Sequence, residues 1–211
     1  MNAMSSDVVT GSSNVAIGRC AGQNISSGAS NFFGGYCAGQ LTTTASNNLY
    51  LGYAAGRCRQ FGNCNIALGY GALKGTSTPT NNSGANNIAL GLDAGKNVKT
   101  GADNIALGQS AMGTGEVTGQ QNITLGLSAG TDITSGSYNI LFGRNIAKGI
   151  TTGSSNIAMG TGTLGGDLAA TTTGSSNVMI GNLNAVGATS AGYNTMAVSY
   201  THLTLPTSDL E

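Results

Sequence analysis

A five-residue segment recurs along nearly the whole chain at an almost fixed spacing, and this repeat constrains the fold more than any other feature. The segment is Asn, an apolar residue, a small or apolar residue, an apolar residue and Gly. It begins at Asn14, Asn48, Asn65, Asn87, Asn104, Asn122, Asn139, Asn156 and Asn177, with a looser copy at Asn31 and a broken one, NTMAV, at Asn194. Seven of the ten successive spacings equal 17, and the others equal 22, 18 and 21. Such a fixed short period is typical of repeat architectures.

Each unit of the repeat predicts one short strand followed by tight corners. The alternation in NIALG places apolar side chains on one face of a strand and Ala on the other. Flanking glycines supply the backbone freedom for the corners. A second short strand is predicted around Ile25, Val98, Ile133 and Ile150, which share the twelfth position of their units. Seventeen residues are too few for a self-sufficient domain, so we predict an all-β, parallel β-solenoid (β-roll) of about eleven 17-residue rungs.

Stacking of such rungs has consequences that can be checked. Ten steps of about 4.8 Å give a rod of roughly 50 Å. The Asn column is predicted to form an amide ladder along the axis, as polar residues do in stacked β structures. The extra residues in the longer units are predicted to loop out at a corner without disturbing the stack. These segments are Gly75–Gly84 and part of Thr161–Gly174.

The strand composition raises a question of burial. A strand face made of Ala gives the coil a thin interior, while the Ile and Leu face still needs cover. Either the larger residues fill the coil, or they contact other chains. A lean coil with an apolar stripe left over favours self-association, and we expect a homotrimer about the rod axis.

The segments SNVAIG, NNIALG and SNIAMG, followed by AG and then TG, resemble the repeats of phage tail-fibre shafts and the head repeats of YadA-like trimeric autotransporter adhesins. The resemblance covers about Asn14 to Ala197. It implies a trimeric left-handed parallel β-roll, although the adhesin repeat is usually shorter than this one. The expected function is a shaft or head of a phage tail fibre that mediates host attachment, located in the virion. The alternative is an adhesin on a bacterial cell surface. Either one would bind a cell-surface glycan or protein receptor.

The chain divides into three segments by this pattern: a lead-in at 1–13, the repeat domain at 14–197 and a tail at 198–211. The tail holds the only His and no Gly. It resembles the translation of a sequencing adapter joined to an environmental gene fragment, so we expect it to be non-native. The N-terminus has no basic region followed by an apolar core. We therefore expect no signal peptide, which favours the phage interpretation over the adhesin.

Charge and hydropathy argue against two classes of partner. The formal net charge is zero, and the eight Lys and Arg residues are scattered along the sequence. Nucleic-acid binding relies on clustered cations, so we expect none. No run of eighteen apolar residues exists, and we expect no membrane span.

Candidate chemical sites are few. Cys20 and Cys37 lie one repeat unit apart and share a column, where they form either a disulfide or two small apolar fillers. Cys58 and Cys64 lack zinc-site spacing. GLDAGKN, at 91–97, departs from the phosphate-loop pattern. The acids, Asp7, Asp93, Asp103, Glu116, Asp132 and Asp167, fall in different columns, whereas a glycosidase needs a facing pair. We expect no catalytic, cofactor-binding or metal-binding residues, no cofactor, and no enzymatic activity.

A column of hydroxyl residues raises ice binding as a lesser alternative. It comprises Ser27, Thr44, Thr100, Thr118, Ser135, Thr152 and Thr173, and Phe61 interrupts it. A flat ice-binding face would require two regular ranks of Thr, and only one is clear. Hydrogen bonding at a corner explains Ser and Thr at this position equally well.

Overall fold

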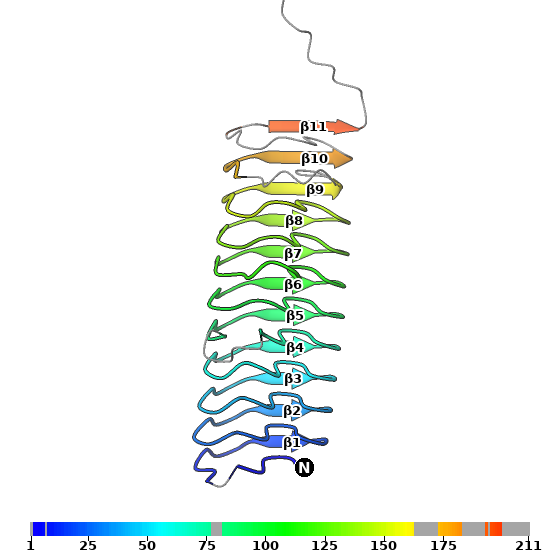
Figure 1. The fold of residues 1–211 in the computed structure, drawn as a ribbon. Coiled ribbons are helices and arrows are strands. Elements are labelled where there is room, and N and C mark those ends of the chain that lie inside the picture. Colours follow the sequence, from blue (N-terminus) through cyan, green and yellow to red (C-terminus); the bar gives the residue numbers. More distant parts are fainter. Residues whose placement is uncertain are drawn as a thin grey trace, which may run out of the picture.

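The computed structural model is a rod built from one column of parallel strands, all pointing the same way (Figure 1). It describes residues 2–6, 8–76, 82–162, 173–182, 193 and 195–199. The strands follow one another in sequence order in a single sheet, with about nine turns of coil. They are β1 (Val15–Ile17), β2 (Phe32–Gly34), β3 (Leu49–Leu51), β4 (Ile66–Leu68), β5 (Ile88–Leu90), β6 (Ile105–Leu107), β7 (Ile123–Leu125), β8 (Ile140–Phe142), β9 (Ile157–Thr161), β10 (Val178–Asn182) and β11 (Thr195–Ser199). The predicted parallel β-solenoid is confirmed.

The register never slips along the stack. Each strand pairs with the next through equivalent positions, so that Ile88 lies beside Ile105 and Leu90 beside Leu107. The same register holds across the two longest units, where Ile66 pairs with Ile88 and Ile157 with Val178. The extra residues therefore leave the stack intact, as predicted. Residues 77–81 and 163–172, which carry most of these two segments, lie outside the described residues.

Glycine after each strand is required by the closeness of neighbouring rungs. Gly52 has φ +133°, and a Cβ added there would lie 2.5 Å from the carbonyl oxygen of Gly69 in the next rung. Equivalent glycines at 18, 35, 69, 91, 108 and 126 repeat this geometry. A side chain at this corner would strain the backbone and push two rungs apart.

The predicted Asn ladder is present and buried. The Oδ1 atom of Asn87 accepts from the backbone N–H of Asn104 at 3.0 Å and from its Nδ2 at 3.1 Å. The Nδ2 of Asn104 also donates to the carbonyl of Gly119 at 3.0 Å, near the end of its own rung. Each amide thus links neighbouring rungs and braces its own coil, a second role that we did not predict.

The predicted second strand is wrong, although its residues lie in the core. Ile25, Val98, Ile133 and Ile150 are at most 1% exposed, but Val98 and Ile150 form no more than isolated bridges, that of Val98 to Val117, and Ile25 and Ile133 form none. The four backbone N–H groups donate three residues back within their own rungs, as from Ile25 to Gly22. A turn hydrogen bond therefore takes the donor that a ladder would need.

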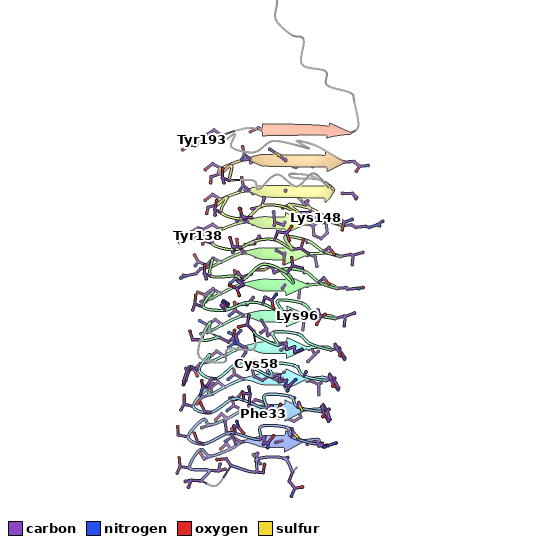
Figure 2. All side chains as sticks on the ribbon, viewed as in Figure 1. Phe33, Cys58, Lys96, Tyr138, Lys148 and Tyr193 are labelled. Atoms are coloured by element: carbon purple, nitrogen blue, oxygen red, sulfur yellow. The ribbon has the colours of Figure 1, made fainter. Side chains whose placement is uncertain are left out.

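The coil interior is filled by pairs of residues whose sizes compensate. Gly39 follows Phe33 in the same rung, and a Cβ on Gly39 would approach the ring of Phe33, which is labelled in Figure 2, to 2.6 Å. In two rungs where the inner strand residue is only Ala, at 67 and 106, the position of Gly39 is taken by the buried Leu73 and Met112. The rung of Ala89 has Gly95 at that position, and there Leu73 of the preceding rung lies close by instead.

Both ends of the described chain contact the stack. The N–H of Met4 donates to the carbonyl of Ala21 at 3.0 Å, so part of the lead-in lies against the first rung. At the other end β11 pairs with β10 as far as Ser199, opposite Asn182. This strand therefore includes the first two residues of the tail predicted from 198. Residues 200–211 lie outside the described part.

Candidate interaction surface

The two faces of the strands are in opposite environments, and this answers the question of what fills the coil. The second residue of each strand from β2 to β10 is buried, as with Ala89, at 0% exposed. The residues before and after it point outward, so Ile88 is half-buried and Leu90 is 36% exposed. The large apolar residues at these outer positions therefore do not fill the coil. They form a surface, which we call the outer apolar face.

The outer apolar face runs along the rod through the first and third strand positions. Twelve of its side chains are 36–62% exposed: Val15, Ile17, Phe32, Leu51, Leu68, Leu90, Ile123, Leu125, Ile140, Phe142, Met159 and Ile180. Their exposed area is on the order of 1,000 Å², whereas the largest apolar patch of a monomeric protein is usually a few hundred Å². A surface of this size is typical of sites where proteins associate.

Beside this face, at the corner after each strand, lies a column that begins with one cation and three aromatic residues. We call Arg19, Tyr36, Tyr53 and Tyr70 the tyrosine corner. The ring centroids of Tyr36 and Tyr53 are 4.9 Å apart, and those of Tyr53 and Tyr70 are 4.8 Å apart, with interplanar angles of 9° and 4°. The Arg19 guanidinium carbon lies 5.7 Å from the Tyr36 ring centroid. The rings thus repeat at the spacing of the rungs.

Four residues further along each rung is a second column that carries cations. We call Arg57, Lys74 and Lys96 the basic column, and they occupy three successive rungs. The Nε of Arg57 donates to Oε1 of Gln40 at 2.9 Å, and Gln40 donates to Gln23, so the column continues downward as amides. These cations are scattered in the sequence because each lies a whole unit away from the next. Folding aligns them, and the expectation that the chain has no clustered cations is wrong at this column.

The four cysteines are free thiols, three of them buried and Cys64 exposed. Cys20 and Cys37 share a column, as predicted, and lie in left-handed backbone conformation with φ 60° and 53°. Burial raises the pKa of the Cys37 thiol, and the neighbouring Cys20 raises it further. Among the described residues no group of three His, Cys, Asp or Glu side chains is placed to hold a metal ion.

The described acids are held by unrelated partners. Asp93 pairs with Lys96 at 3.2 Å and Glu116 with Lys99 at 2.6 Å. Asp132 accepts from Thr114 Oγ1 at 2.7 Å and from the N–H of Gly149 at 3.1 Å. Asp7 and Asp167 lie outside the described residues. GLDAGKN forms the same corner as its counterparts in other rungs, and its Lys96 belongs to the basic column.

A buried arginine lies inside the coil, and it was not predicted from the sequence. Arg59 is 0% exposed and donates through its Nη atoms to the carbonyls of Val98, at 2.9 Å, and Gly84. Burial lowers its pKa, and burial raises the pKa of the adjacent Tyr50 to about 12. Arg59 lies in the unit before the one that contains the extra residues 77–81. It donates to one carbonyl of that longer unit and to one carbonyl of the unit after it. Its position in the column of Ile25 and Val98 was the available signal.

Comparison of the chain with models of protein families, with characterised proteins and with solved structures gives no match. The structure therefore carries the fold assignment by itself. Within the described ranges, no helix is both long and apolar enough to cross a bilayer.

Proposed function

We propose that this chain is a structural and adhesive segment of a fibre, the shaft or head of a phage tail fibre that mediates attachment to a host. The observation that carries the proposal is the outer apolar face, which runs along a rod with constant register. A monomeric solution protein does not maintain such a surface. A fibre made of several parallel chains buries it.

The rod is suited to spanning a distance as a stiff, extended segment. Every rung is tied to the next by strand pairing, by the buried Asn ladder and by the corner glycines, whose backbones lie in close contact. Because each rung contacts mainly its neighbours, length is added without a change in cross-section. Receptor contact would then fall to surfaces that face solvent, such as the corners and inserted segments.

A homotrimer about the rod axis is the assembly we propose. A partner that covers a stripe of this length must have the same length and the same repeat, and another copy of the chain has both. Parallel copies place Ile88 and Leu90 of each chain at one height. Copies arranged about the rod axis can each contact two neighbours through the outer apolar face, which closes a ring.

Two other functions use the same geometry. A head of a bacterial surface adhesin would have this rod and this face, and would differ in the domains joined to it. Ice binding would use the Ser/Thr column, whose members are all exposed at the described positions. That column remains a single rank with Phe61 in it, 42% exposed. A gap between the melting and freezing temperatures of a solution of the protein would favour ice binding instead.

Solution scattering and light scattering test the proposal together. We expect the mass of three chains and a particle several times longer than it is wide. Purified fibre carrying a fluorescent label should also bind to the surface of host cells in a saturable way. A compact monomer at all concentrations would overturn the fibre assembly. An elongated trimer that binds none of a broad panel of bacterial cells would overturn the adhesive role and leave a purely structural one.

A further inference from the structure

The tyrosine corner exposes a surface of unusual chemistry. Tyr36, Tyr53 and Tyr70 are 41%, 48% and 55% exposed. Because they stack on one another, both electron-rich faces of Tyr53 are covered by neighbouring rings, and Tyr36 lies between Tyr53 and the Arg19 guanidinium. The solvent therefore meets ring edges, which carry partial positive charge, and phenol O–H groups, which donate hydrogen bonds. Such a surface attracts oxygen-rich anions.

The basic column adds formal positive charge beside these rings. The Cys37 thiol lies between the two columns: burial and Cys20 raise its pKa, while hydrogen bonding with Tyr36 and the charge of Arg57 lower it. Arg57 and Lys74 both lie near Cys58, where their charges oppose the effect of burial on its pKa. Asp93 pairs with Lys96, but Lys96 remains partly exposed and surface pairs of this kind are weak.

Charge is also divided along the axis of the rod. From residue 14 to residue 102 the sequence has one acid, Asp93, and six basic residues, of which all but the buried Arg59 can lie at the surface. From residue 103 to residue 197 it has two basic residues and four acids. The tyrosine corner and the basic column both belong to the positive half. Association of three parallel chains would bring three such surfaces to the same end of the fibre.

We propose that the tyrosine corner and the basic column bind a linear acidic polysaccharide that lies along the rod axis. The donors recur once per rung, about 4.8 Å apart, and an extended sugar chain presents its hydroxyls and carboxylates at a comparable repeat. This inference names the receptor class for the proposed attachment function and rests on that function for its biological meaning.

The same observations argue against a nucleic acid at this surface. Proteins that hold single strands offer free aromatic faces on which bases stack. Here Tyr53 has a ring on each side, so no base can reach its faces. Edges and O–H groups are suited instead to the hydroxyls and carboxylates of uronic acids.

The proposal is tested by measuring the binding of polygalacturonate of uniform length with titration calorimetry. Fully methyl-esterified polygalacturonate has the same backbone without the charge and serves as the neutral probe. We expect the acidic polymer to bind, with affinity that falls as NaCl rises, and the ester to bind at least tenfold more weakly. The variant Arg57→Gln/Lys74→Gln/Lys96→Gln should lose about tenfold in affinity or more, and Tyr36→Leu/Tyr53→Leu/Tyr70→Leu should lose a similar factor.

A matched control exists in the same two columns, higher in the rod. Arg144 occupies the position of the tyrosines and Lys148 that of the basic column, on the same side of the rod as Lys96 (Figure 2). The variant Arg144→Gln/Lys148→Gln removes two positive charges and leaves the residues of the proposed surface unchanged. Its affinity for polygalacturonate should remain within about twofold of that of the parent protein. Light scattering on every variant checks that the assembly is unchanged.

Equal binding of the ester, absence of binding by both polymers, or equal loss in the control would each overturn the proposal. Tighter binding of a single-stranded oligodeoxynucleotide than of polygalacturonate would overturn it in favour of a nucleic-acid ligand. An elongated trimer that does not bind polygalacturonate would overturn this inference and leave the fibre proposal unaffected. A monomer that binds it would do the reverse.

Discussion

The inner and outer faces of the same strands are built by opposite rules. Inside, the residue type changes from rung to rung: Phe33, Tyr50, Ala67 and Leu141 all occupy one column. Yet all are buried, because the turn across the coil supplies the complementary size. Outside, most of the residues are Ile or Leu, with Val, Phe, Met and Gly at the other positions, and nothing in the described chain covers them. The comparison shows that one chain completes its core by itself and leaves a large apolar surface exposed, which the proposed trimer would cover.

The largest effect should come from emptying the interior. Phe33→Ala removes a ring that is 0% exposed and stacks on Tyr50 with centroids 5.5 Å apart. We expect the free energy of unfolding to fall by about 3–5 kcal/mol, measured by urea denaturation. The adjacent Phe32 is 37% exposed on the outer face. Phe32→Ala, at a concentration too low for assembly, should cost less than about 1 kcal/mol.

The compensation rule predicts a rescue of that loss. Phe33→Ala/Gly39→Leu recreates the pair of Ala67 and Leu73, and Leu73 already has a positive φ of 47° at the position equivalent to Gly39. The double variant should recover more than half of the lost free energy, less about 1 kcal/mol for a left-handed Leu. No recovery would show that each rung is packed independently of this rule.

The Asn ladder should give the next largest effect. Asn104→Ala leaves the N–H of Asn122 and the carbonyl of Gly119 without their side-chain partners in a buried place. A loss of about 2–4 kcal/mol in the free energy of unfolding is expected. Asn86 is exposed and donates to Asp103, so Asn86→Ala is the control; it should cost no more than about 1 kcal/mol, because Ala replaces Asn at a left-handed φ of 57°. Similar losses in both variants would contradict a special role for the ladder.

Alkaline pH should destabilise the fold through the buried Tyr50. Burial raises the pKa of Tyr50 from its ordinary value near 10 to about 12. The folded state therefore keeps its proton when the unfolded state has lost it. The resulting stability is complete below pH 10 and is lost as pH rises through 12, by roughly 2–3 kcal/mol. Tyr50→Phe should remove this step from a series of urea denaturations at increasing pH. Tyr138→Phe, at a position 60% exposed, should leave it in place.

Much of the fold followed from the spacing of the Asn residues, because one period fixes which residues stack. The ladder, the register across long units and the single strand face all depend on that period alone. The prediction of a second strand failed because the backbone N–H of Ile25 donates within a local turn, to Gly22, and not to a neighbouring rung. Hydropathy does not reveal this competition. The size exchange between Phe33 and Gly39 could not be predicted from the two columns, because Ala89 has Gly95 at the equivalent position. The basic column was hidden because Arg57 and Lys74 are distant in sequence and adjacent only after folding.

The smallest effect should come from the outer face, and it should appear in assembly rather than in folding. Leu90→Thr keeps a residue that favours strands and removes apolar surface from a side chain that is 36% exposed. We expect a cost of about 0.5–1 kcal/mol per chain, seen as a higher concentration at which the trimer dissociates in light scattering. Thr100 is exposed in the Ser/Thr column, and Thr100→Ala should leave that concentration unchanged. An equal shift in both variants would place the contact between chains elsewhere, and a shift confined to Leu90→Thr would place it on the outer apolar face.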